Sequence, residues 1–294
     1  MNLIIIKKIK NIFNKIFLTE DALPLFESNH FISKSSINLN LCSFGRKNKK
    51  KIFYVIRRSP GAGMFSNFIY VLNHLNVALE NNFIPVIDMQ NFTTIYNEKG
   101  KVNDTYNAWE YYFEKLNKYS LKEVYKSQNV ILTSKIFQDN MILDIYKKNY
   151  LKYLKKIKIK KQYHRKANNF FKKNFSGSDN ILGVHFRGST YKTARGHAYP
   201  PSASEMIKNI NNLIKKYGYD KIFLVTEEMK YLKCLKKKFG NKLFFYKSFR
   251  MQNIDSFKIY PRTKHRYKLG EENLIEALLL SKCKGLTYVK SNLT

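Results

Sequence analysis

The feature that most restricts how this sequence can fold is its alternation of short apolar runs with glycine turns and helical segments. Residues 52–56 (IFYVI) form a β-branched and aromatic run, and the glycine-containing turn at 57–63 (RRSPGAG) follows it directly. Apolar residues then recur at helical spacing over 64–80, and a second run, IPVID, occupies 84–88. A strand, turn, helix and strand in this order predict the opening of a parallel sheet.

The same alternation returns in the second half of the chain. Further strands are predicted at residues 181–186, 221–226, 243–246 and 286–289. Helices are predicted at about 202–217, where the capping pattern SASE opens the helix, in a lysine-rich segment that ends near 239, and at about 271–282. We therefore expect an α/β fold whose two halves meet near residues 160–178.

This pattern predicts a lead-in segment and two domains. Residues 1–50 are expected to be a basic amphipathic and loosely ordered lead-in, 51–165 an N-terminal domain, and 166–294 a C-terminal domain. Residues 101–162 are expected to be helical or irregular, with an aromatic group at 109–113 that packs in a core. The eight lysines at 147–161 are typical of a solvated helix face, with a groove for an acidic acceptor as the alternative.

The charge of the chain is extreme, at a formal +33 from 54 Lys and Arg against 21 Asp and Glu. Such an excess suits a nucleic acid, an anionic membrane or an anionic small substrate, and a composition rich in Lys, Asn and Ile of the kind that an AT-rich coding sequence favours explains part of it. The lysines are dispersed and no nucleic-acid-binding signature occurs, so a specific nucleic-acid partner is not expected. A basic nucleic-acid-binding protein stays open as an alternative, which a steep salt dependence of polynucleotide binding would support.

The N-terminus (MNLIIIKKIKNIFNKIF) is neither a membrane span nor a standard signal peptide, because its apolar run is short and no small-residue cleavage site follows. At helical spacing its apolar residues share one face and its lysines lie largely opposite. This indicates a helix that lies on an anionic membrane, or one that packs on the rest of the protein. Three widely spaced cysteines without a zinc pattern favour a reducing compartment, so we expect a cytoplasmic protein, peripheral on the inner face of the membrane.

Two predicted strand ends carry residues suited to an anionic ligand. At the first, Gly61 and Gly63 permit close backbone approach, and the helix that leads to Asn67 offers free N–H groups; the alternative is an ordinary tight turn. At the second, His185 and Arg187 fall on the same face of a strand because the side-chain period is two. An arginine at this place can pair with a phosphate through two parallel hydrogen bonds.

The segment 183–190 (GVHFRGST) resembles the H-x-R motif of the fucosyltransferase superfamily, which includes α1,6-fucosyltransferases, the nodulation fucosyltransferase and protein O-fucosyltransferases. Other segments resemble that family's motifs in the same order along the chain: GAGMFSN at 61–67, GHAYPP at 196–201, FLVTEE at 223–228, LIEALLLSKC at 274–283 and KSN at 290–292. The resemblance covers about residues 52–294, and the ordered co-occurrence of short motifs is its specific part.

The resemblance implies a GT-B-like fold, with two Rossmann-type domains facing a cleft and the acceptor on the N-terminal side. It implies an inverting, metal-independent transfer of fucose from GDP-fucose to a glycan or glycolipid acceptor, with no cofactor and no metal site. Arg187 would contact the donor diphosphate and act in catalysis. The other implied donor-binding residues are Gly61, Gly63, Asn67, His185 beside the nucleoside, Glu276 at the guanine edge, and Ser291 and Asn292 near the phosphates.

The sequence departs from the family pattern at two places. Ser189 and Thr190 stand where the family has Thr-Asp, and no carboxylate follows before Pro200, so His197 is the candidate catalytic base. The chain also ends at Thr294, directly after the third motif, where the family continues with a helix. A truncated, non-catalytic remnant that binds a sugar nucleotide is therefore the alternative function.

Overall fold

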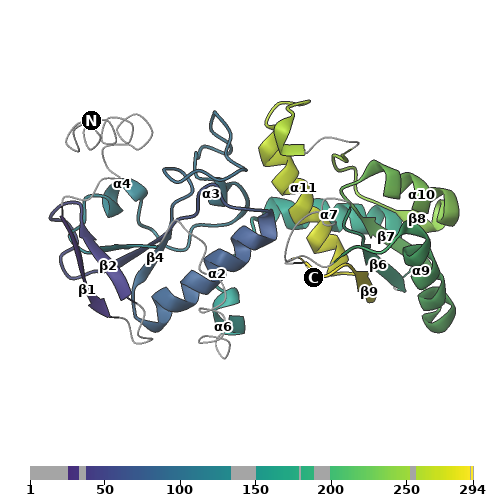
Figure 1. The fold of residues 1–294 in the computed structure, drawn as a ribbon, viewed down its shortest axis with the longest axis horizontal. Coiled ribbons are helices and arrows are strands. Elements are labelled where there is room, and N and C mark those ends of the chain that lie inside the picture. Colours follow the sequence, from purple (N-terminus) through teal and green to yellow (C-terminus); the bar gives the residue numbers. More distant parts are fainter. Residues whose placement is uncertain are drawn as a thin grey trace. The chain divides into compact units, whose positions relative to one another are not determined.

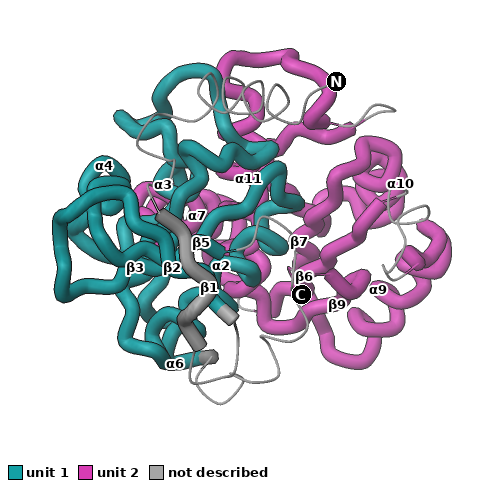
Figure 2. Tube along the Cα trace, turned by 60° about the vertical axis from the view of Figure 1, so that its left-hand side comes forward, with its two compact units in different colours: residues 1–158 teal, residues 159–294 magenta. Residues whose placement is uncertain are grey.

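The computed structural model describes residues 26–32, 38–133, 150–178, 180–188, 199–251, 256–291 and 293. The chain divides into two compact units, Met1–Lys158 (unit 1) and Ile159–Thr294 (unit 2), which Figure 2 colours separately. The positions of the units relative to one another are not determined, so the predicted cleft between them stays a prediction (Figure 1).

Unit 1 is built on a five-stranded sheet of order β1-β2-β5-β3-β4. The strands are β1 (Phe26–Ile32), β2 (Asn38–Ser43), β3 (Phe53–Ile56), β4 (Ile84–Ile87) and β5 (Val130–Leu132). β3 runs parallel to β4 and β5, whereas β2 runs antiparallel to both β5 and β1. Helix α2 (Met64–Glu80) connects β3 to β4 along the sheet, as the strand–helix–strand pattern predicts (Figure 1).

The two antiparallel strands correct the prediction of a loosely ordered lead-in. β1 and β2 both lie before residue 50, and Leu41 and Cys42 pair with Ile131 and Val130 of β5. The alternation of apolar and polar residues in β2 covers only six residues, and its burial depends on a partner almost ninety residues later in the chain. Local patterning is too short there to indicate the strand. The predicted amphipathic helix at the N-terminus lies outside the described residues.

The core of unit 1 lies on both faces of the sheet. Tyr54 turns toward α2, where its hydroxyl lies 2.9 Å from Nδ1 of His74. On the other face, Phe53 and Val55 pack in a cluster that includes Val86 and Tyr125. The aromatic group at 109–113 is buried as predicted, in and next to the short helix α3 (Ala108–Tyr112). Two further short helices are α4 (Leu121–Val124) and α6 (Tyr150–Leu154), the latter being the described helical part of 147–161.

Unit 2 contains a wholly parallel sheet of order β8-β7-β6-β9. Its elements, in chain order, are α7 (Lys161–Phe175), β6 (Ile181–His185), α9 (Ala203–Tyr217), β7 (Lys221–Val225), α10 (Met229–Phe239), η3 (Gly240–Lys242), β8 (Leu243–Phe244), η4 (Ser256–Lys258), α11 (His265–Leu280) and β9 (Gly285–Tyr288). All four predicted strands are confirmed. So is the capping box between Ser202 and Glu205 at the start of α9.

Helices cover both faces of this sheet, so unit 2 has three layers (Figure 1). Leu182 and Val184 of β6 pack in a cluster with residues of α9 and α10. On the opposite face, the ring of Phe223 lies 6.2 Å from that of Phe175 in α7, and Gly183 faces Leu280 of α11. Because α7 is one continuous helix on this sheet, the second unit begins at Ile159 rather than at residue 166.

The strand order places one preferred ligand position in unit 2. Counted within the unit, the strands stand in the order 3-2-1-4, so the sheet grows in one direction from β6 to β8 and then reverses to β9. Open parallel sheets of this kind bind ligands beyond the carboxyl ends of the two strands where the direction reverses. Those strands are β6 and β9. Within the described ranges no helix has the length and apolarity that crossing a bilayer requires.

Candidate functional site

The carboxyl ends of β6 and β9 bring together residues that lie a hundred positions apart in the sequence. His185 is the last residue of β6 and pairs in register with Tyr288 of β9. The backbone N–H of Val289 donates to the His185 carbonyl oxygen at 3.0 Å. Arg187 and Ser291 follow these strand ends by two or three residues, so the sheet places both sequence-predicted residues at the same edge.

His185 is held as a neutral imidazole. Its side chain is 3% exposed, and burial, followed by the positive charge of Arg187, lowers the pKa of His185 to about 3. Its Nδ1 is buried and has no hydrogen-bond partner among the residues that the structure describes. A buried polar atom without a partner is costly, so a ligand that bonds to this nitrogen gains affinity.

Glu227 fixes the segment that follows β6. Its Oε1 accepts a hydrogen bond from the backbone N–H of Gly188 at 2.8 Å and lies 3.5 Å from Nε of Arg187. The Arg187 side chain keeps 31% of its surface exposed. One carboxylate therefore holds both the backbone and the guanidinium at the edge of the sheet. Sequence reasoning placed Glu227 in a motif without assigning it this role.

Gly188 is required at its position by a close neighbour. A Cβ built on this residue would run into the side chain of Glu228, which is buried and paired with Lys230 at 3.0 Å. Any larger residue at 188 must displace this carboxylate or move the backbone beside Arg187.

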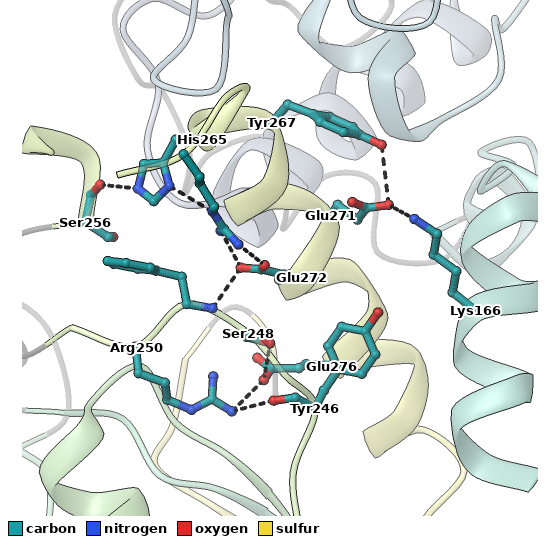
Figure 3. A network of polar contacts seen from close by, with 12 residues as sticks. Lys166, Tyr246, Ser248, Arg250, Ser256, His265, Tyr267, Glu271, Glu272 and Glu276 are labelled. Carbon is teal, nitrogen blue, oxygen red and sulfur yellow. Dashed lines mark hydrogen bonds and ion pairs between the residues drawn. The ribbon is translucent and has the colours of Figure 1, made fainter. Parts of the chain in front are cut away.

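Glu276 lies on α11 and is bound to the loop that follows β8 (Figure 3). Its Oε1 accepts from Nη2 of Arg250 at 3.0 Å and from Oγ of Ser248 at 2.7 Å. The same Nη2 donates to the Tyr246 carbonyl oxygen at 3.1 Å. Burial raises the pKa of Glu276 to about 7, although Arg250 and Ser248 oppose this rise. Arg250 was not among the sequence-predicted residues.

Two more carboxylates of α11 brace the surroundings of Glu276 (Figure 3). Glu272 binds both terminal nitrogens of Arg262, at 2.5 and 2.8 Å, and accepts from the backbone N–H of Phe249 at 3.0 Å. Glu271 pairs with Lys166 of α7. The helix is thus tied to α7 on one side and to the 246–251 loop on the other, which fixes where Glu276 points.

The glycine turn in unit 1 is held by Asn67. Its Oδ1 accepts from the Ala62 N–H at 2.9 Å and its Nδ2 donates to the Ala62 carbonyl oxygen at 3.0 Å. Gly61 has φ +74°, and a Cβ there would lie 2.8 Å from Asn67 Oδ1, so glycine is needed for both reasons. Helix α2 begins after Gly63 without a side-chain cap and without an acid in its first turn. Asn67 thus shapes the turn, and the hydroxyl of Tyr96 already accepts from the N–H of Met64, the first residue of α2, at 2.8 Å.

Two sequence-predicted residues, His197 and Asn292, lie outside the described residues. Ser291 is described, and its Oγ accepts from the Leu293 N–H at 3.2 Å. Across the described ranges, no group of three or more His, Cys, Asp and Glu side chains is arranged to hold a metal ion.

No family model matches this sequence, and no curated protein matches it either. Solved structures do match in fold. One is a NodZ α-1,6-fucosyltransferase co-crystallized with GDP, which has 16% sequence identity and a TM-score of 0.56 over 83% of this chain and 91% of that chain. Another is the fucosyltransferase NodZ from Bradyrhizobium, at 15% identity and a TM-score of 0.53 over 80% and 88% of the two chains.

A further match is a NodZ α-1,6-fucosyltransferase soaked with GDP-fucose, at 14% identity and a TM-score of 0.51 over 83% of this chain and 90% of that chain. Identities this low establish the fold and leave the activity to be argued from the site. The resemblance to the fucosyltransferases that the sequence motifs predict is therefore confirmed at the level of fold, and this chain has the α/β fold of the NodZ structures.

Proposed function

We propose that this protein is a glycosyltransferase that binds GDP-fucose at the carboxyl edge of the unit 2 sheet and transfers fucose to a glycan or glycolipid acceptor. The observation that carries the proposal is the arrangement of His185, Arg187 and Ser291 at the ends of β6 and β9, where this strand order favours a ligand. The fold supports it, because matching structures are fucosyltransferases that were co-crystallized with GDP or soaked with GDP-fucose.

In this proposal the diphosphate lies against Arg187. The guanidinium is partly exposed and Glu227 holds it at the edge of the sheet, so phosphate oxygens can approach it there. The neutral His185 provides a nitrogen that can hydrogen-bond the nucleoside. Ser291 is a further candidate for a phosphate contact, as the resemblance implies.

The guanine base is assigned to Glu276. A carboxylate can accept hydrogen bonds from the N1–H and the N2 amino group of guanine, whereas adenine and the pyrimidines lack this pair of donors on one edge. Arg250 and Ser248 hold Oε1 of the carboxylate in place. They act as positioning residues, since a carboxylate with a fixed orientation loses less entropy when it binds the base.

The proposed reaction is a single displacement with inversion. The acceptor hydroxyl oxygen forms a bond to the anomeric carbon of fucose while the bond from that carbon to the β-phosphate oxygen breaks. Negative charge then grows on the leaving diphosphate, and Arg187 stabilises it. The hydroxyl proton leaves to a base, for which His197 stays the sequence-based candidate.

Contact of the basic N-terminus with an anionic membrane is a further proposal, and it too rests on the sequence alone.

Calorimetric titration of the purified chain with GDP, GDP-fucose, UDP and ADP in EDTA tests the donor assignment. We expect selective binding of the guanine nucleotides, lost in Arg187→Ala and kept in Arg165→Ala, an exposed arginine of α7 that serves as the matched control. Equal affinity for all four nucleotides would contradict the proposal. GDP binding with no transfer to any acceptor in a screen would favour the non-catalytic alternative.

A further inference from the structure

We propose that unit 1 carries a binding site for a neutral saccharide, in a cavity of about 440 Å³ beside the edge strand β4. The cavity is lined by residues 85–87 of β4, Gln90, and residues of the segments 101–110 and 115–122. Its volume falls in the range of small-molecule sites. This inference rests on the proposed function, which it deepens by naming the chemical class of the acceptor.

The floor of the cavity is the outer edge of β4, where two backbone carbonyl groups already accept hydrogen bonds. β4 is the last strand of its sheet, and Pro85 has no N–H to offer there. Nδ2 of Asn117 donates to the Pro85 carbonyl oxygen, and Nδ2 of Asn107 donates to the Ile87 carbonyl oxygen at 2.7 Å. Two amide side chains thus occupy the outer edge of the strand and hold the cavity walls against it. The edge is closed to another strand, and the cavity is preformed.

A tight turn shapes one wall. Val102 and Thr105 pair as an antiparallel bridge, and the two residues between them, Asn103 and Asp104, have φ of 49° and 63°. Oε2 of Glu110 accepts from Oγ1 of Thr105 at 3.1 Å and so braces the turn. Positive φ at two successive non-glycine residues is uncommon, and here it places Asp104 among the residues that line the cavity.

Several polar groups of the lining are uncommitted. Nε1 of Trp109 is buried and has no hydrogen-bond partner within the described part of the chain. The side chains of Gln90 and Asp104 also make no hydrogen bond to any described residue. The lining therefore offers an indole donor, an amide and a carboxylate beside the 44% exposed ring of Tyr106. The ring of Trp109 itself stacks on Phe68 and Phe113. Sugar hydroxyls both donate and accept, so they can satisfy all three groups.

The charge of the lining argues for a neutral ligand. The lining holds Lys101, Lys115 and Lys122 against Asp104 and Glu110, so the net charge is 3 − 2 = +1. Lys115 lies 3.8 Å from Glu110, and Lys101 lies over the ring of Tyr106. In a chain of formal charge +33, this near balance sets the cavity apart from a surface suited to an anionic donor or polymer.

The protein contains a single tryptophan, Trp109, which lines the cavity and also stacks on Phe68 and Phe113, so its fluorescence responds to changes around this one ring. The test is a fluorescence titration of the full chain with neutral tetrasaccharides of glucose, galactose, mannose and N-acetylglucosamine. Tetragalacturonate and a glucosamine tetramer serve as the anionic and cationic comparisons. We expect a saturable change with at least one neutral tetrasaccharide and a weaker response to both charged ones. Calorimetry with the same sugars detects binding that leaves the fluorescence unchanged.

Variants assign the binding to the cavity. Gln90→Ala removes one hydrogen-bonding amide, and Asp104→Asn replaces a charged acceptor by a weaker neutral one, so each should weaken binding, by up to about tenfold. Glu114→Gln, an exposed acid of unit 1 outside the cavity, should leave it unchanged. The inference is overturned if no neutral tetrasaccharide binds, if a charged one binds more tightly, or if both cavity variants bind as the wild type does.

A GDP titration on the same samples separates this inference from the proposed function. GDP binding without saccharide binding overturns the cavity assignment and leaves the donor assignment standing. Saccharide binding without GDP binding supports the cavity assignment and overturns the donor assignment.

Discussion

The carboxyl edges of the two sheets use similar residues in different ways. In unit 1, Nε of Arg57 donates to the Thr133 carbonyl oxygen at 2.6 Å. Arg58 is buried, donates to the Ser66 carbonyl oxygen at 2.9 Å and lies over the ring of Tyr70. The charges that follow β3 are therefore engaged by the protein itself.

In unit 2 the corresponding groups keep capacity for a ligand. His185 has a buried nitrogen without a partner among the described residues, and the Arg187 side chain keeps 31% of its surface exposed, with its Nε 3.5 Å from Glu227. Both units have an arginine just after their first parallel strand, β3 or β6, but the described residues differ in how far the protein itself engages these side chains. The comparison teaches that topology selects the edge where a ligand can bind, and that the local hydrogen bonds decide whether that edge is a scaffold or a site.

The largest effect is expected from removing the charge at the unit 2 edge. Arg187→Ala should lower the rate of fucose transfer by about 100-fold or more, as the loss of a group that stabilises developing negative charge does in other enzymes. Arg187→Lys keeps the charge but loses the planar fork, so it should recover only part of the rate. Initial rates with GDP-fucose and an identified acceptor measure this. Near-normal turnover of Arg187→Ala would remove the distinction between the two edges.

In unit 1, a loss of stability is expected from neutralising Asp88, a buried carboxylate at the carboxyl end of β4. Asp88 follows β4 with no exposed surface and accepts from the backbone N–H groups of Gln90 and Asn91 and, at 2.6 Å, from the hydroxyl of Tyr125. Asp88→Asn replaces an acceptor with a donor in this buried cluster and should destabilise the unit by about 2–3 kcal/mol. Chemical denaturation measures it, with GDP affinity of the folded protein expected to stay unchanged.

Asp104→Asn is the matched control, because Asp104 is exposed and its side chain makes no hydrogen bond to a described residue. It should change stability by no more than about 0.5 kcal/mol. Weakened GDP binding in correctly folded Asp88→Asn would show that the unit 1 edge takes part in donor binding and is more than a scaffold.

Sequence reasoning succeeded where the signal was local. Helix α2 was predicted over 64–80 and has those bounds, because its apolar spacing, the glycine turn before it and the strand after it agree. Arg187 and His185 can be identified from the sequence because they lie two residues apart at the end of one short strand, β6, whose last residue is His185. The strand order 3-2-1-4 then explains why these residues lie at a ligand-binding edge, although no local pattern encodes that order.

The unpredicted features all depend on residues that are distant in sequence. Arg250 meets Glu276 across 26 positions, and nothing in the segment around Arg250 indicates its partner. The sequence shows Glu227 as one member of an acidic pair. It does not indicate the hydrogen bond with Gly188, because the two residues lie 39 positions apart. The cavity beside β4 requires Asn117 to reach back to Pro85, across 32 positions. Such contacts arise from tertiary packing, which patterns of 2 and 3.6 residues do not report.

A smaller effect, on affinity, should reveal the role of Glu276. Its pKa is raised to about 7, so it carries a proton in much of the population at pH 6 and is ionised at pH 8. Only the ionised form accepts both guanine donors, so GDP affinity should rise about tenfold between pH 6 and pH 8. UDP corrects for the titration of the diphosphate, so the ratio of GDP to UDP affinity is the quantity to measure. In Glu276→Gln this ratio should no longer depend on pH; a slope that persists would assign the titration to another group.

The smallest effect on GDP affinity is expected from replacing His185. The informative result is that this effect should not depend on pH. Burial and Arg187 lower the pKa of His185 to about 3, so the imidazole stays neutral from pH 5 to pH 8. His185→Gln should weaken GDP binding by about two- to tenfold, the effect of one neutral hydrogen bond, and by the same factor at every pH in that range. A histidine that charged near neutrality would instead bind the diphosphate more tightly in acid, and the variant would lose that gain. Calorimetry at pH 5, 6.5 and 8 separates the two cases. A constant factor would mean that the unit 2 edge attracts the diphosphate through Arg187 and that His185 serves as a neutral hydrogen-bonding group.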